Sequence, residues 1–288
     1  MFSRTIKAII PSCHTSLKNC SSNLTPKSFC YKLNRQLNVA RVGSVGWKTA
    51  VKNLDPKQVE FYHSEQLIKV DSQDKTLGSI SKGESHSIET VRNSIYHRAL
   101  SLLIFDEQDR FLLTQRASCK ITFPNYYTNA CCSHPLYEPN EMEDDGDAIG
   151  VKRATIRRAK FELGIESNEI QPSELKFVNR LAYRAESDGG QWGESEVDYI
   201  FILRKNVKLT PNPDEVQDLR YVTKREMQQL LVNYRESDVK ITPWVRLLAR
   251  DFLFLYWDNL NNLDHIAQPD KIVHYEGMFP VGPSPWDD

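Results

Sequence analysis

The feature that most constrains the fold is a run of alternating acidic residues at the start of an apolar segment. Glu194, Glu196 and Asp198 are two residues apart, so an extended backbone places their side chains on one face. Residues 200–202 (Ile-Phe-Ile) follow, which predicts that this strand enters the core. Carboxylates at the mouth of a buried strand are costly unless they are paired or bind a metal. A solvated edge strand would show the same alternation, so the pattern alone leaves both interpretations open.

A second extended run places a thiol and an imidazole on one face. In residues 127–135 (YTNACCSHP), Cys132 and His134 point the same way and Cys131 points the opposite way. Taken alone this is weak evidence for a site. A cysteine on a buried strand is usually a small inert hydrophobic residue, and a histidine beside it is more often hydrogen-bonded than catalytic.

Two further histidines lie upstream. His97 is inside an apolar run and His86 is in the loop before it, at a spacing that fits no zinc finger. Each alone is more often an ordinary hydrogen-bonded histidine. Together with His134, Glu194 and Glu196, however, they would form a shell of nitrogen and oxygen ligands. Such a shell suits zinc, manganese or another divalent ion better than calcium.

A predicted helix carries an incomplete diphosphate-binding motif. Residues 148–163 have helical periodicity and Gly164 ends the helix. The end of this segment is similar to a Nudix box, whose hydrolase form reads R-E-U-x-E-E-x-G-U (U is apolar) and binds magnesium around a diphosphate. Four positions match: Arg157, Glu162, Gly164 and Ile165. Three glutamates of the box are replaced by other residues: Ile149, Arg158 and Phe161. This loss should abolish a hydrolytic magnesium cluster, although Glu162 could still hold one ion.

The order of the elements predicts an α+β fold, an α/β/α sandwich with a mixed sheet. The expected strands are 67–71, 77–80, 95–105, 110–116, 126–132, 177–183 and 197–203. The expected helices are 148–163, 224–231 and 244–256. A chain of 288 residues suits one large domain with a tail. We expect a basic tail over 1–54, the domain over 55–265 and a C-terminal extension over 266–288.

Four motifs in one order resemble the type I isopentenyl-diphosphate isomerases. They are T-N-x-C-C-S-H-P, the altered Nudix box, W-G-E-x-E-x-D-Y and I-T-P-W at residues 241–244. The flanking K-I-T-F-P (120–124) and F-L-F-x-x-W-D-N-L (252–260) agree as well. The resemblance covers residues 66–258, about two thirds of the chain. It implies a Nudix-like fold and the isomerisation of isopentenyl diphosphate to dimethylallyl diphosphate in isoprenoid biosynthesis.

The resemblance also implies roles for individual residues. The catalytic cysteine and glutamate of the family match Cys132 and Glu196, and Tyr183 matches a tyrosine that could relay a proton. The family's metal ligands match five residues: His86, His97, His134, Glu194 and Glu196. A magnesium ion on the diphosphate would use Glu162, while a second divalent ion (zinc, manganese or magnesium) would occupy the His/Glu site. The substrate-binding residues implied are Lys82, Arg116, Lys120, Arg158 and Trp244.

The expected reaction explains these residue types. Moving an unactivated double bond requires one proton to be added and another removed on opposite faces, through a tertiary carbocation. The sequence does not determine whether Cys132 or Glu196 is the donor. The Trp244 ring could stabilise the cation, although a tryptophan at this position could equally be a core residue. Magnesium, arginine and lysine neutralise a diphosphate, although any of these basic residues could also be a solvated surface charge.

The charge distribution bears on targeting and partners. Residues 1–54 contain no Asp or Glu but several Lys and Arg, which is typical of a transit peptide, although an untargeted basic tail has the same composition. We expect mitochondrial import, with plastid, cytoplasm and peroxisome as alternatives. A net charge of −1 gives no indication of nucleic-acid binding, and no apolar run is long enough for a membrane span. The six cysteines form no CxxC pair and suggest free thiols. We expect a monomer that binds a small prenyl diphosphate.

Two other functions remain as alternatives at this point. A Nudix-type diphosphate hydrolase is disfavoured by the missing glutamates. A zinc-stabilised binding module is disfavoured because structural zinc sites usually have four ligands and favour cysteine.

Overall fold

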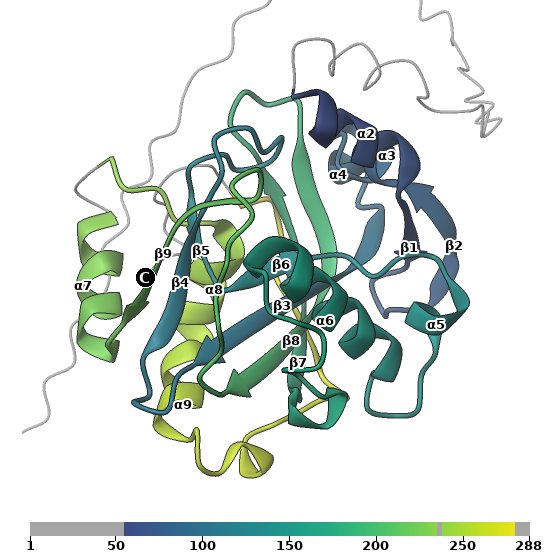
Figure 1. Cartoon of the computed structure of the whole chain (residues 1–288). Coiled ribbons are helices and arrows are strands. Elements are labelled where there is room, and N and C mark those ends of the chain that lie inside the picture. Colours follow the sequence, from purple (N-terminus) through teal and green to yellow (C-terminus); the bar gives the residue numbers. More distant parts are fainter. Residues whose placement is uncertain (1–54, 235–237, 280–288) are drawn as a thin grey trace, which may run out of the picture. The chain divides into compact units, whose positions relative to one another are not determined.

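The computed structural model describes residues 55–234 and 238–279, all within one compact unit (Figure 1). The expected basic tail over 1–54 and the Pro-rich residues 280–288 lie outside this description. In the described part, no helix has the length and apolar character needed to cross a membrane.

A mixed sheet forms the centre of the fold, with the strand order β10-β7-β8-β3-β1-β2. The bounds of these strands are β1 Gln66–Val70, β2 Thr76–Ser81, β3 Tyr96–Phe105, β7 Lys176–Glu186, β8 Gly193–Arg204 and β10 Ile272–His274. Strand β3 runs parallel to β8 and antiparallel to β1, and β7 runs antiparallel to β8. The structure therefore confirms the expected mixed sheet.

Four more strands branch from this path. They are β4 Phe111–Arg116, β5 Tyr127–Thr128, β6 Cys131–Ser133 and β9 Val216–Val222. Strand β6 pairs with the middle of β3, while β4 pairs with the end of β3 and also with β5 and β9. The extended run expected over 126–132 is thus divided between two partners, and this places Cys132 beside Ser101 of β3.

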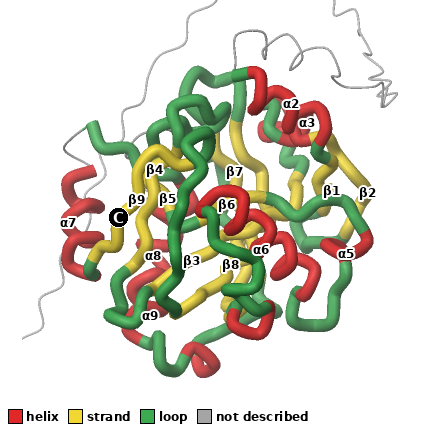
Figure 2. The backbone as a smooth tube through the Cα atoms, in the orientation of Figure 1, coloured by secondary structure: helices red, strands yellow, loops and turns green. Residues whose placement is uncertain are grey.

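Helices lie on both faces of the sheet (Figure 2), and alternate residues of β3 pack against the helices of each face. Leu100, Leu102 and Ile104 pack in the core cluster that contains α6 Ile149–Leu163. Leu103 and Phe105 pack in the other cluster, which contains the C-terminal helices. Those helices are α7 Lys224–Tyr234, α8 Pro243–Asp251 and α9 Leu253–Asp258. This arrangement is the α/β/α sandwich that the sequence predicts.

Short elements that the sequence reading did not identify lie before β3 and between the longer elements. Their bounds are α2 Pro56–Ser64, α3 Lys82–Ser85, α4 Ile88–Arg92, α5 Pro139–Met142, η2 Pro172–Glu174 and η3 Leu263–His265. In addition, the helical segment expected over 244–256 is interrupted at Phe252, whose φ of −138° separates α8 from α9. Short helices carry too few turns for a periodic pattern to reveal them.

The described part of the expected C-terminal extension packs against the domain. Strand β10 pairs in parallel with β7, and Phe279 is buried in the same cluster as α8. The boundary expected at residue 265 stays a prediction.

Helix α6 ends at Gly164, as the sequence predicts, and this glycine allows a substitution test. Its φ is +66°, and an added Cβ would lie 2.2 Å from the Thr210 carbonyl oxygen. Gly146 also has a positive φ of +84°, but an added Cβ there would meet nothing within 4 Å. We expect Gly164→Ala to lower the free energy of unfolding by about 2–4 kcal/mol, and Gly146→Ala by about 1 kcal/mol. Urea unfolding of both variants measures the difference. Equal losses would contradict the proposed close approach of Thr210.

Candidate active site

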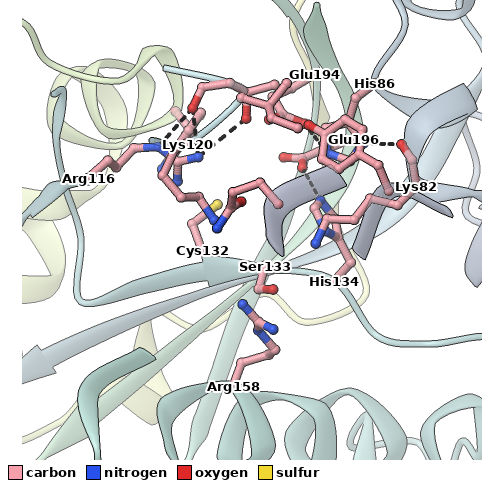
Figure 3. A pocket seen from close by; sticks show the side chains of 15 residues that line it. Lys82, His86, Arg116, Lys120, Cys132, Ser133, His134, Arg158, Glu194 and Glu196 are labelled. Carbon is pink, nitrogen blue, oxygen red and sulfur yellow. Dashed lines mark hydrogen bonds and ion pairs between the residues drawn. The ribbon is translucent and has the colours of Figure 1, made fainter. Parts of the chain in front are cut away.

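One pocket gathers most of the residues singled out from the sequence (Figure 3). It lies where β6 and β8 meet the loop that follows β4, and α2 contributes Gln58 and Tyr62 to its wall. The expected site residues that line it are Lys82, His86, Arg116, Lys120, Cys132, His134, Arg158, Glu194, Glu196 and Trp244. His97, Tyr183 and Glu162 do not line the pocket but contact residues that do.

Three histidines and two glutamates form one buried cluster. One potential ligand atom from each of these residues lies within 4.8 Å of the corresponding atom of every other. The pairing of β3 with β8 places His97 directly beside Glu196, and Glu194, two residues earlier, is on the same face of β8. His134 comes from the end of β6 and His86 from the end of α3. The cluster therefore joins four separate segments of the chain.

The orientation of the imidazoles suits metal binding. His86 Nδ1 lies 2.8 Å from the Lys82 carbonyl oxygen. Because a carbonyl can only accept, Nδ1 donates to it and Nε2 is the ring nitrogen that faces the cluster. That Nε2 is 3.0 Å from Glu194 Oε2. A backbone carbonyl thus holds the first of the three histidines with Nε2 directed to the cluster, as a metal ligand requires.

Buried ring nitrogens without a hydrogen-bond partner show whether the His/Glu cluster fits a metal ion. Among the described residues, both ring nitrogens of His97 and the Nδ1 of His134 have no hydrogen-bond partner. Such atoms are rare in folded proteins and call for a partner. Burial, with the neighbouring His86, lowers the pKa of His97 to about 3 and that of His134 well below its ordinary value. Both imidazoles are therefore neutral, as metal ligands must be. The cluster fits a divalent metal ion.

Glu196 is shared between the metal cluster and a proton-bearing group. Its Oε1 is 3.0 Å from His134 Nε2, and its Oε2 accepts a hydrogen bond from the Tyr183 hydroxyl. Tyr183 stands directly opposite Glu196 in the β7–β8 ladder. Burial, together with Glu194 and Asp198, raises the pKa of Glu196 well above its ordinary value. A raised pKa suits a group that gives a proton to a substrate.

Cys132 is the thiol that faces the pocket, as the strand-face argument predicts (Figure 3). Burial and the nearby carboxylate of Glu196 raise the pKa of the Cys132 thiol well above its ordinary value, so it is protonated. Cys131 points to the opposite side of β6 and packs in the cluster with α6. Asp198, the third alternating carboxylate, is fully buried and accepts a hydrogen bond from Ser101 Oγ at 2.8 Å.

The expected substrate-binding cations also line the pocket, but each has a partner. Lys82 Nζ lies 2.5 Å from Glu65, and Lys120 Nζ lies 2.5 Å from Glu215. Arg116 donates to the carbonyl oxygens of Thr122 and Phe123. Sequence reasoning missed Glu65, Glu215 and also Ser133, Gln58 and Tyr62 of the pocket wall. Glu65 and Glu215 follow no motif, and Glu215 is 95 residues from its partner Lys120.

The altered Nudix box has a new arrangement of side chains. Arg158 stands at one missing glutamate and donates to Glu162 at 2.7 Å. Phe161 stands at another and packs edge-on against Phe61 of α2, with ring centroids 5.6 Å apart. At the end of the Nudix box, Glu162 is therefore the one glutamate that remains. It pairs with Arg158 instead of lying among other carboxylates.

Comparison with known proteins identifies the family. The NUDIX domain model matches residues 95–245. Isopentenyl-diphosphate Delta-isomerase 1 of Bos taurus is 43% identical over 225 residues, which cover 78% of this chain and 98% of the relative. The isopentenyl-diphosphate Delta-isomerase of Dictyostelium discoideum is 39% identical over 219 residues, which cover 75% of this chain and 91% of the relative. The chain belongs to the isopentenyl-diphosphate Delta-isomerase family. The NUDIX match agrees with the sandwich fold described above.

In this member of the isomerase family, an ion pair between the partly exposed Arg157 and the buried Glu141 holds the backbone next to one histidine of the cluster. Arg157 donates to both carboxylate oxygens of Glu141, at 2.6 and 2.9 Å. The same arginine donates to the His134 carbonyl oxygen at 3.2 Å, and Glu141 accepts from the Leu136 backbone N–H at 2.7 Å. The pair thus fixes the backbone over residues 134–136 and, through it, the position of the imidazole.

Substituting Arg157 therefore tests how the cluster is held. We expect Arg157→Met to weaken binding of zinc or manganese about 10- to 100-fold, the usual effect of losing an outer partner of a metal ligand. Competition against a chromogenic chelator measures this affinity. Arg153→Met is the matched control, because Arg153 is on the same helix but bonds Asn140 and Glu143 instead. Equal affinities in the two variants would show that the ion pair does not position His134.

Proposed function

We propose that this chain converts isopentenyl diphosphate to dimethylallyl diphosphate. The observation that carries the proposal is that Cys132 and Glu196 face one pocket that is also lined by four cationic side chains. The names of the relatives, which are isopentenyl-diphosphate Delta-isomerases, support the same reaction.

The acid and base roles fall to Cys132 and Glu196. The reaction adds a proton to the terminal carbon of the double bond and removes one from the neighbouring methylene, through a tertiary carbocation. One of the two groups gives the proton that is added, and the other, without its proton, takes up the one that is removed, in a site shielded from bulk water. Tyr183 donates to Glu196 and relays a proton to that carboxylate, with its own oxygen taking up another proton as it gives one away.

The His/Glu cluster is the proposed site of a divalent ion, zinc, manganese or magnesium. His86, His97, His134, Glu194 and Glu196 would hold it. When bound, such an ion would supply a positive charge that fixes the orientation of Glu196 and increases its acidity. Glu196 keeps its bond from Tyr183 on the other oxygen, so the carboxylate has a defined direction.

The diphosphate is proposed to bind among Lys82, Arg116, Lys120 and Arg158. In the structure their positive charges contact Glu65, Glu215, Glu162 and backbone carbonyls, and a diphosphate would take over part of these contacts. A magnesium ion on the diphosphate would use Glu162 and would reduce the negative charge that the cations must neutralise. Trp244 is proposed to face the carbocation and to stabilise it through its ring.

Replacing the two adjacent cysteines separates their roles. We expect Cys132→Ala to lower kcat at least about a hundredfold, because one proton-transfer group is lost. Cys131→Ala should keep most of the turnover, since its side chain faces α6. The assay follows dimethylallyl diphosphate and solvent deuterium incorporation by NMR in D₂O with magnesium. No product from folded, metal-loaded wild-type protein would refute the proposed function.

A lysine substitution tests the diphosphate subsite. We expect Lys120→Gln to raise KM for isopentenyl diphosphate about 10- to 100-fold, the effect of one charge-assisted hydrogen bond. Lys57→Gln is the control, because Lys57 pairs with Asp214 beside Glu215 but lies on the surface. Steady-state kinetics of both variants, with thermal melts to check folding, measure the effect. An unchanged KM in Lys120→Gln would place the diphosphate elsewhere.

Targeting to mitochondria is proposed on composition, because residues 1–54 contain no acidic residue. Fusing this segment to a fluorescent protein and imaging cells tests it. Plastid, peroxisomal or diffuse cytoplasmic fluorescence would favour one of the alternatives. The expected monomeric state is a separate prediction, which light scattering of the purified protein can test.

A further inference from the structure

We propose that Thr128 and Asn129 are positioning residues that orient and polarise the Trp244 ring for the carbocation. This inference rests on the proposed function and extends it to two residues of the T-N-x-C-C-S-H-P motif that have no other role so far. Its basis is a closed network of hydrogen bonds behind the indole.

The indole N–H is held by two oxygens at once. Trp244 Nε1 donates to Thr128 Oγ1 and to Asn129 Oδ1, each at 2.9 Å. Trp244 is 1% exposed and lines the active pocket. A tryptophan that served only to fill the core would need one partner for its N–H. Two acceptors fix the rotation of the ring as well as satisfying the donor.

The network leaves no freedom to rearrange. Thr242 donates to Thr128 Oγ1 at 3.1 Å, and Thr128 donates to Asn129 Oδ1 at 3.1 Å. Asn129 Nδ2 donates to the carbonyl oxygens of Leu102 and Cys131, at 3.2 and 2.8 Å. Because both carbonyls only accept, the Asn129 amide cannot flip, and its oxygen must face the indole. The hydroxyl hydrogens of Thr128 and Thr242 and both amide hydrogens of Asn129 are therefore all donated to an acceptor.

The same amide links the two sides of the pocket. Cys131 directly precedes the proposed proton-transfer residue Cys132, and Trp244 begins the first turn of α8. Asn129 therefore joins the backbone of the thiol-bearing strand to the ring of the helix. The buried Asn129 side chain therefore sets the distance between Cys132 and the indole. The five-carbon chain of the substrate would lie in the space between them.

The hydrogen bonds also affect the electrons of the ring. An N–H that donates to oxygen acceptors shifts electron density into the indole and makes its faces more negative. A more negative face attracts a carbocation more strongly, while a neutral alkene gains little. The network should therefore favour the intermediate over the substrate, and its loss should lower kcat more than it raises KM.

The test compares two diphosphates of the same shape. One carries a tertiary ammonium at the position of the cationic carbon, and the other is a saturated, uncharged alkyl diphosphate. We expect Thr128→Val to weaken binding of the ammonium compound about 3- to 10-fold and to leave the neutral compound within about twofold. Isothermal titration with magnesium present measures both affinities. Thr128→Ser, which keeps the hydroxyl, should restore wild-type discrimination.

The matched control is Thr114→Val. Thr114 Oγ1 donates to the Asn129 backbone carbonyl at 2.8 Å and is equally buried, so this change removes a hydrogen bond from the same asparagine without touching the indole. It should leave the preference for the ammonium compound unchanged. If Thr128→Val does not fold, β-(3-benzothienyl)alanine at position 244 replaces the N–H by sulfur and should reduce the same preference.

The outcomes separate this inference from the proposed function. Wild-type protein that turns over isopentenyl diphosphate and prefers the ammonium compound, with no change of preference in either Thr128→Val or the benzothienyl variant, would overturn the inference alone. Equal losses for both compounds would show a purely structural role and would also overturn it. Wild-type protein without isomerase activity would refute the proposed function itself.

Discussion

The parallel pairing of β3 with β8 is the interaction on which the rest of the structure depends. It joins nine residue pairs, from His97 beside Glu196 to Phe105 beside Arg204, in the middle of the sheet. At one end the paired strands carry the buried imidazole and carboxylates of the site. At the other end they carry apolar residues that pack against α6 and against the C-terminal helices. The same ladder therefore supplies both the core and the polar cluster.

The buried charges beside the pocket are offset by charges of the opposite sign. The cations around the diphosphate subsite are matched by Glu65, Glu162 and Glu215, and although burial opposes ionisation, Lys120 and Arg158 lower the pKa of Glu215 to about 2. Close to the carboxylates of the His/Glu cluster, burial instead keeps Cys132 protonated. Lys120 and Arg158, the partners of Glu215, line the same pocket as Cys132. The pocket therefore has a part suited to anions and a part suited to proton transfer, separated by only a few side chains.

Supporting contacts set the direction of the reactive groups. The Lys82 carbonyl directs Nε2 of His86 to the cluster, Arg157 and Glu141 hold the backbone at His134, and Tyr183 fixes one oxygen of Glu196. On the side of the substrate's hydrocarbon chain, Thr128 and Asn129 hold the Trp244 ring. Apart from the partly exposed Arg157, the groups that make these hydrogen bonds are buried, so their geometry is maintained by the packing around them.

Much of the site could be predicted from the sequence, because its residues lie in local patterns. The period of two placed Cys132 and His134 on one face and Cys131 on the other, and it aligned Glu194 with Glu196. The motifs T-N-x-C-C-S-H-P and W-G-E-x-E-x-D-Y, with the altered Nudix box, indicated the family. The hydrophobic periodicity of the sequence did not predict α2, α3 and α4, because helices of nine, four and five residues are too short to show it. It also gave no sign of Glu65 and Glu215, which belong to no motif.

The sequence by itself determined which side chains share a strand face, where α6 ends, and which chemistry the residues of each motif can perform. Only the tertiary structure decided that four distant segments meet in one His/Glu cluster, and that Arg158 bonds Glu162 in place of the lost carboxylates. It alone showed that the indole N–H of Trp244 faces Thr128 and Asn129, more than a hundred residues earlier in the chain. The physical reason is that strand periodicity acts over neighbouring residues, whereas these contacts depend on sheet register and helix packing. Both are fixed only when the whole core is buried.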